Sequence, residues 1–166
     1  TDFLGNRKLE AYPGNFPSRS TATSRATQRH RAWDDMGFYA FLAIGIGAAS
    51  GAWLRWGLGI LLNPLFPTLP LGTLAANLLG GFLMGVAMQF LLEHAVLPPE
   101  IRLAITTGFL GGLTTFSTFS AETVTLLLRE EYLWTLAIIL MHVIGSVAMT
   151  LLGILAMKLL TTAGIS

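Results

Sequence analysis

The 166-residue sequence contains no cysteine. This absence excludes disulfide bonds, thiolate nucleophiles and cysteine-ligated metal sites. Charged side chains are also scarce, at 11% of the residues, and basic and acidic groups nearly cancel to a formal net charge of +1. A chain so poor in charge does not favour nucleic-acid binding or long-range electrostatic steering.

Apolar residues, in contrast, make up 53% of the chain, and the mean hydropathy is +0.65. These values are too high for an ordinary soluble domain, so we expect the lipid bilayer to be the solvent. A helix needs ~20 apolar residues to cross ~30 Å of hydrocarbon. The chain therefore has room for several spans but not for a large soluble domain as well.

Residues 1–35 differ from the rest, because Ser, Thr, Arg and Pro dominate them and no apolar period persists. This composition predicts a disordered, polar and basic N-terminal extension. Met36 stands directly before the first apolar run. We interpret residues 1–35 as upstream translated sequence or a dispensable extension that is not part of the functional protein; a functional arm and a transit peptide are the alternatives.

Four apolar segments follow, and each is long enough to cross a bilayer. The sequence therefore predicts an all-α integral membrane protein with a four-helix transmembrane domain at residues 36–166. Its Gly and Ala content predicts close packing between helices, as expected where lipid gives no hydrophobic drive to association. The predicted spans cover about residues 36–62, 71–92, 100–128 and 132–160.

The basic residues of this domain do not choose an orientation. Arg102 and Lys158 fall on the N-terminal side of the membrane, and Arg55 and Arg129 on the other side. Two against two is a balance under the positive-inside rule. The six Lys and Arg residues of 1–35 change the count to eight against two, which predicts a cytoplasmic N-terminus for the chain as printed.

Polar residues inside the spans are costly unless they are paired or line a wet path. Asn77 is interpreted either as an amide donor to an anion or as a bond to a neighbouring helix. Arg55 is either an anion attractor in a vestibule or a side chain that snorkels to the headgroups. His142, Ser146 and Thr150 are four residues apart, so helical geometry predicts a polar stripe on one face.

The third segment carries the motif GGLTTFSTFSAE from Gly111 to Glu122. The glycine pair lowers helix propensity, so we predict a helix that is broken near its middle, with freed carbonyls that could hold a cation. Phe116 and Phe119 share one helix face. They either face the lipid or pack in the core, or they present positively polarised ring edges to an anion. Glu122 continues their stripe and lies either near the interface or in a functional position.

This motif, together with GAWLRWGLG, GTLAANLLGGFLMG and HVIGSVAMT, resembles the Fluc (CrcB-type) fluoride channel family. The resemblance covers about residues 36–160 and leaves the extension out. It implies a passive, selective fluoride channel in the cell inner (plasma) membrane that exports fluoride from the cytoplasm and relieves its toxicity. It also implies an antiparallel, dual-topology homodimer with two pores and a central structural sodium ion.

The resemblance also implies roles for single residues. Asn77 resembles the pore amide donor, and Phe116 and Phe119 the pore rings. Gly111 and Thr114 match the positions whose backbone carbonyls hold the sodium ion. The remaining matching positions of the fluoride pore are Thr115, Ser117, Thr118, Glu122, the polar track His142, Ser146 and Thr150, and the vestibule residue Arg55.

Other classes remain open as alternatives. A small dual-topology multidrug exporter needs an acidic residue in its first span, and residues 36–62 contain none. A proton-coupled fluoride antiporter needs membrane acids, of which Glu122 is the only candidate. An enzyme is not expected, because no nucleophile and base pair or metal cluster is evident. A purely structural helical oligomer would explain the glycines but not the aligned polar residues.

Overall fold

The computed structural model describes residues 19–66, 68–93 and 97–164, with side chains from residue 37 onward. The chain divides into two compact units, Thr1–Asp35 and Met36–Ser166. Helix α1 (Arg19–Leu62) begins inside the range for which the sequence predicted disorder. Ala and Arg, both good helix formers, recur from residue 19 onward and favour this. The expectation for residues 1–18 lies outside the described residues.

The described part of the second unit consists of helices joined by turns and short extended links, and it contains no strand. Three of its helical stretches are long and apolar enough to cross a membrane: Gly37–Leu65, Leu71–Glu93 and Tyr132–Thr162. The first consists of the later part of α1 with the short 3₁₀ turn Asn63–Leu65, and the others are α2 and α6. These match three of the four predicted spans; a count of four stays a prediction.

The segment predicted as the third span is divided into short pieces. They are α3 (Pro99–Leu103), the π-helix η2 (Ala104–Leu110), α4 (Gly111–Leu113) and α5 (Phe116–Leu128). Thr114 and Thr115 between α4 and α5 are extended, with φ/ψ of −83°/152° and −149°/119°. The segment is therefore broken near its middle.

The glycine pair lies just before this break and is itself helical. Gly112 packs against the backbone of Ala48 in α1, where a Cβ atom would overlap the carbonyl of Ala48. Gly112 therefore serves close helix approach, and the chain leaves the helix only at Thr114. Gly47 and Gly51 of α1 meet the same segment backbone to backbone.

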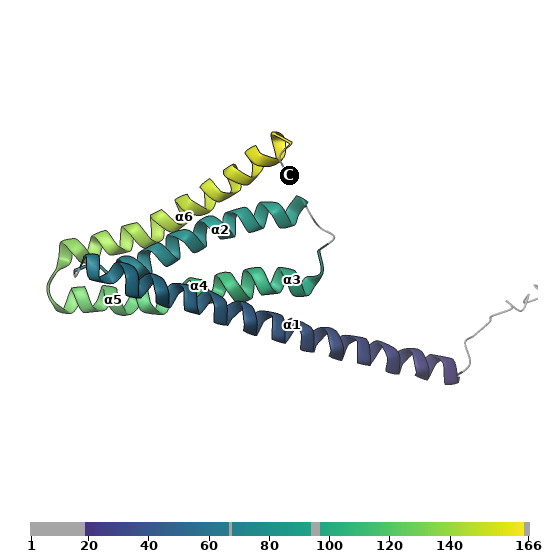
Figure 1. Ribbon diagram of the computed structural model, residues 1–166. Helices are drawn as coiled ribbons and strands as arrows, with labels where there is room; N and C mark the ends of the chain where they lie inside the picture. Colours follow the sequence, from purple (N-terminus) through teal and green to yellow (C-terminus); the bar gives the residue numbers. More distant parts are fainter. Residues whose placement is uncertain (1–18, 67, 94–96, 165–166) are drawn as a thin grey trace, which may run out of the picture. The chain divides into compact units, whose positions relative to one another are not determined.

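Helices α2 and α6 lie side by side along most of their length, and a tight turn joins α5 to α6 (Figure 1). Gly81 and Gly85 of α2 and Gly153 of α6 bring the two backbones together, because a Cβ at each would meet backbone atoms of the other helix. This close packing agrees with the expectation from the glycine content. It sets Asn77 of α2 against His142 of α6, the centre of the site described next.

Candidate functional site

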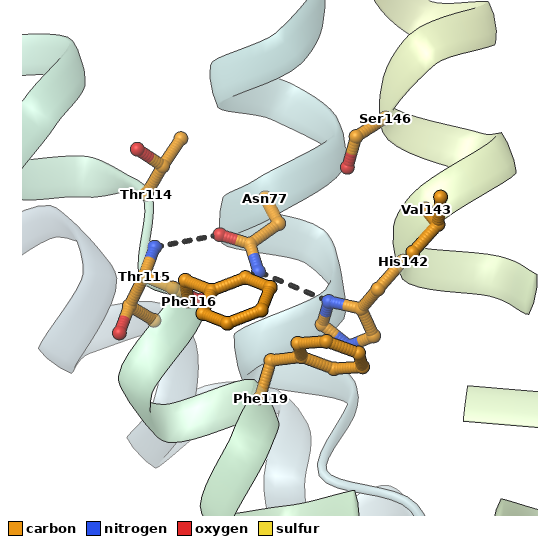
Figure 2. A pocket seen from close by; sticks show the side chains of 8 residues that line it. All are labelled: Asn77, Thr114, Thr115, Phe116, Phe119, His142, Val143 and Ser146. Carbon is orange, nitrogen blue, oxygen red and sulfur yellow. Dashed lines mark hydrogen bonds between the residues drawn. The ribbon is translucent and has the colours of Figure 1, made fainter. Parts of the chain in front are cut away.

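An open cavity of about 300 Å³ lies where the break between α4 and α5 faces α2 and α6 (Figure 2). Most of its lining residues were singled out from the sequence; Val143 was not. The lining consists of Asn77, Thr114, Thr115, Phe116, Phe119, His142, Val143 and Ser146. Three segments far apart in the sequence therefore converge on it.

Asn77 ties these segments together through one amide group. Its Oδ1 accepts a hydrogen bond from the backbone N–H of Thr115 at 2.8 Å. Its Nδ2 donates to the carbonyl of Thr115 at 3.0 Å and lies 3.0 Å from Nδ1 of His142. The side chain thus serves both backbone groups of the residue at the break: the N–H, which has left the helical ladder, and the C=O, which belongs to the N-cap of α5. In this respect Asn77 joins helices, one of the two interpretations left open by the sequence.

Thr115 also caps the N-terminus of α5. Its Oγ1 accepts from the backbone N–H of Thr118 at 3.2 Å, as expected for an N-cap threonine. The same oxygen donates to Oγ1 of Thr118 at 3.1 Å and lies 3.2 Å from Oγ of Ser117. Ser117 and Thr118 therefore belong to a hydroxyl cluster at the N-terminus of α5, and neither lines the cavity around Asn77.

The break redirects the hydrogen bonds of two carbonyl groups predicted to bind sodium. In a continuous helix the carbonyl of Gly111 would accept from the N–H of Thr115, and that of Thr114 from the N–H of Thr118. These N–H groups instead donate to Asn77 and to the Thr115 hydroxyl. Both carbonyls have therefore lost their helical donors.

The two phenylalanines of the motif have different environments. Phe119 is buried at 7% exposure, whereas Phe116 is 77% exposed. Their rings make an edge-to-face contact with centroids 5.4 Å apart. Phe119 also stacks on the imidazole of His142 at 4.7 Å. Only Phe119 is therefore part of the packed core, and Phe116 forms an open wall of the cavity.

The polar stripe of α6 is only partly directed into this cavity. His142 and Ser146 line it. Thr150 donates its hydroxyl to the carbonyl of Ser146 at 2.9 Å and lies beside Gly81 of α2. A hydroxyl that bonds its own helix in this way is common in membrane helices, and Thr150 is not among the lining residues.

Glu122 belongs to a neighbouring cavity of about 290 Å³, which Thr118 and Arg129 also line. Its Oε1 accepts a hydrogen bond of 2.5 Å from the hydroxyl of buried Thr73 in α2. Among the described residues Oε2 has no partner. The sequence reasoning missed Thr73, although its position four residues before Asn77 places it on the same face of α2.

Arg55 reaches the broken segment from α1. Its Nε donates to the carbonyl of Gly112 at 3.2 Å, and its side chain lines a third cavity, of about 560 Å³, that includes Asn63 and Thr73. The carbonyl of Gly112 would otherwise lack a donor, because the helix ends one residue later. Arg55 therefore stabilises the break directly.

Within the part of the chain that the structure describes, no group of three or more His, Asp or Glu side chains is placed to hold a metal ion. The polar groups gathered here are instead amide, imidazole and hydroxyl groups beside aromatic rings. Such a set can replace the water around a small anion without a permanent charge of its own.

The sequence matches the family profile described as CrcB-like protein, Camphor Resistance (CrcB), over residues 42–154. It is 67% identical over 123 residues to the fluoride-specific ion channel FluC of Nitrosospira multiformis, an alignment that covers 74% of this chain and 96% of that protein. Proteins of the same name from Tolumonas auensis and Cupriavidus taiwanensis are 59% and 54% identical, over 74% and 75% of this chain and 96% and 99% of their own. The chain therefore belongs to the CrcB-type (FluC) fluoride ion channel family, whose members are channels and not enzymes.

Proposed function

We propose that this protein is a passive, fluoride-selective channel of the cell inner membrane that exports fluoride from the cytoplasm and so relieves its toxicity. The observation that supports the proposal most strongly is the cavity at the break, where Asn77, the two phenylalanines, His142 and Ser146 come together. The relatives are named fluoride-specific ion channels, and these names support fluoride as the ion that passes through the cavity.

The chemistry of the cavity suits a small, tightly hydrated anion. Hydroxyl and N–H groups can donate to fluoride as water does, and the edges of aromatic rings carry partial positive charge. Phe119 and Phe116 meet edge to face at the cavity wall. Arg55 lines a separate cavity and would act as an attractor for anions approaching the pore, while Ser117, Thr118 and Glu122 would lie along the path beyond Phe119.

We further propose a homodimer of antiparallel, dual-topology chains with two pores and one structural sodium ion at its centre. The carbonyls of Gly111 and Thr114 fit this ion, because oxygen dipoles freed at a helix break suit a hard cation. Two carbonyls are too few to replace a hydration shell, so a second copy would complete the site. Gly111 is exposed in the single chain and open to such a copy.

Fluoride efflux from liposomes tests the channel function. The purified full chain is reconstituted in liposomes loaded with potassium fluoride, and efflux is followed with a fluoride electrode after addition of valinomycin. We expect rapid fluoride efflux that stops when valinomycin is omitted, because a passive channel needs a compensating current. Equal efflux of chloride from matched liposomes, or no efflux of fluoride, would contradict the proposal.

The same liposomes separate a channel from a proton-coupled exporter, whether a fluoride antiporter or one of multidrug type. A coupled carrier drives fluoride against its electrochemical gradient when a pH gradient is imposed, whereas a channel moves fluoride only down that gradient. Replacing sodium with N-methylglucamine tests the ion site. Without sodium we expect the dimer to have a lower thermal stability.

The dual topology is tested by the orientation of the chain in the membrane. The chain with residues 1–35 removed should insert in both orientations.

A further inference from the structure

The amide of Asn77 has no donor left over for an anion. One N–H of Nδ2 points to the carbonyl of Thr115, and the other faces His142, both at 3.0 Å. Because Oδ1 accepts from the N–H of Thr115, the amide cannot be turned over without opposing two donors. The orientation of this side chain is therefore fixed by the backbone at the break.

This orientation also fixes the proton of His142. Nδ2 of Asn77 is only a donor, so Nδ1 of His142 must accept and carries no hydrogen. The neutral imidazole then has its single N–H at Nε2. A proton on Nδ1 would place two donors 3.0 Å apart and would break the contact that holds the two helices together at this level.

The Nε2–H group is a buried donor of this cluster that remains unused. His142 is 4% exposed, and among the described residues Nε2 is buried without a hydrogen-bond partner. A buried N–H without a partner is rare in native proteins and indicates a missing ligand or water. Figure 2 shows the imidazole between Asn77 on one side and the stacked ring of Phe119 on the other.

We propose that Asn77 is a positioning residue that holds His142 in its Nε2–H tautomer, and that His142 donates the hydrogen bond to the anion at this level of the pore. The proposal rests on the function proposed above. Phe119 stacks on the face of the imidazole, so it holds the ring in place while the Nε2–H remains the donor for the anion. Asn77 acts on the anion only through His142 and through the break.

The tautomer is tested by ¹⁵N NMR of the full chain labelled at its histidines, reconstituted in liposomes at neutral pH. Replacing the other two histidines of the chain, His30 and His94, leaves the signal of His142 alone in the spectrum. We expect a protonated Nε2 and an unprotonated Nδ1. In Asn77→Asp the carboxylate offers only acceptors to Nδ1, so the proton should move to Nδ1 or a second proton should bind there.

A pair of substitutions tests the role as donor. His142→Asn keeps an acceptor near the position of Nδ1 but has nothing at Nε2, whereas His142→Gln places an amide N–H near Nε2. We expect fluoride flux to fall roughly tenfold or more in His142→Asn, by the loss of a hydrogen bond to a charged group, and to fall less in His142→Gln. Flux in the Asn variant equal to that of the wild type would overturn the role as donor.

An Nδ1–H tautomer or an imidazolium in the wild type would overturn the positioning role of Asn77, even if both His142 variants fail to fold. The NMR result does not depend on transport. Wild-type protein that shows the expected tautomer but conducts no fluoride would therefore refute the proposed function and leave the positioning of His142 intact.

Discussion

Substitution of Gly81 by alanine should separate α2 from α6 at the level of the site. A Cβ atom on Gly81 would lie 2.8 Å from the carbonyl oxygen of Ser146, whereas ordinary van der Waals contact begins at 3.4 Å. The oxygen belongs to a helix backbone and cannot rotate away. The two helices must therefore move apart by about 0.6 Å, the difference between these two distances.

This movement acts one helical turn from the contact that defines the site. Gly81 lies four residues after Asn77, and Ser146 lies four residues after His142. If the full displacement is transmitted, the 3.0 Å contact between Asn77 and His142 lengthens to about 3.6 Å, beyond hydrogen-bond range. Overpacking costs about 1–3 kcal/mol, and the better helix propensity of alanine offsets about 0.5–1 kcal/mol of this.

We therefore expect Gly81→Ala to lower the free energy of unfolding by about 1 kcal/mol and to reduce fluoride flux clearly. Gly145→Ala is the matched control in the same interface. Its Cβ would also meet an atom at 2.8 Å, but that atom is Cδ2 of Leu78, the end of a flexible side chain that can rotate. Thermal unfolding in detergent and liposome efflux measure both variants. If the two variants prove indistinguishable in flux and in stability, the reasoning is refuted.

Three further predictions concern the walls of the cavities. Phe119→Ile should reduce both flux and stability, because a buried stacked ring is lost. Phe116→Ile, at an exposed position, should reduce flux but leave the stability of the chain unchanged. Equal losses of stability in the two variants would contradict this. Thr73→Val removes the hydroxyl that donates to Glu122 and should cost about 1–3 kcal/mol of stability, measured by thermal unfolding, with Thr73→Ser as the control that keeps the donor. Arg55→Lys keeps the charge but loses the Nε–H that caps the broken segment, so we expect lower stability with little change in anion attraction, read from flux at low and high ionic strength.

The helical class and the segment boundaries were predictable because they follow from local composition. The predicted spans at 71–92 and 132–160 differ from α2 and α6 by one or two residues. Their starts were predictable because Pro70 directly precedes α2, and the turn at Glu130 precedes α6. The break was expected from Gly111 and Gly112. Its actual position at Thr114 was not predictable, because it depends on hydrogen bonds from α2.

Within the candidate site, only residues that share one face of the same helix could be predicted to lie together. The spacing of His142 and Ser146 placed both on one stripe, and both line the cavity. The different burial of Phe116 and Phe119 could not be read from their spacing, because it depends on His142 of another helix. The bond between Thr73 and Glu122 likewise joins residues 49 apart in the chain.

The hydrogen bonds of Asn77 to Thr115 have a consequence for biogenesis. A segment that enters the bilayer before it meets α2 must satisfy all its own backbone groups, and only a continuous helix does so. The Thr115 N–H, which has no hydrogen-bond partner within its own segment, finds one on Asn77 only after the two segments have docked. We therefore expect residues 99–128 to be inserted as one unbroken helix, and the break to form later, when this segment docks on α2.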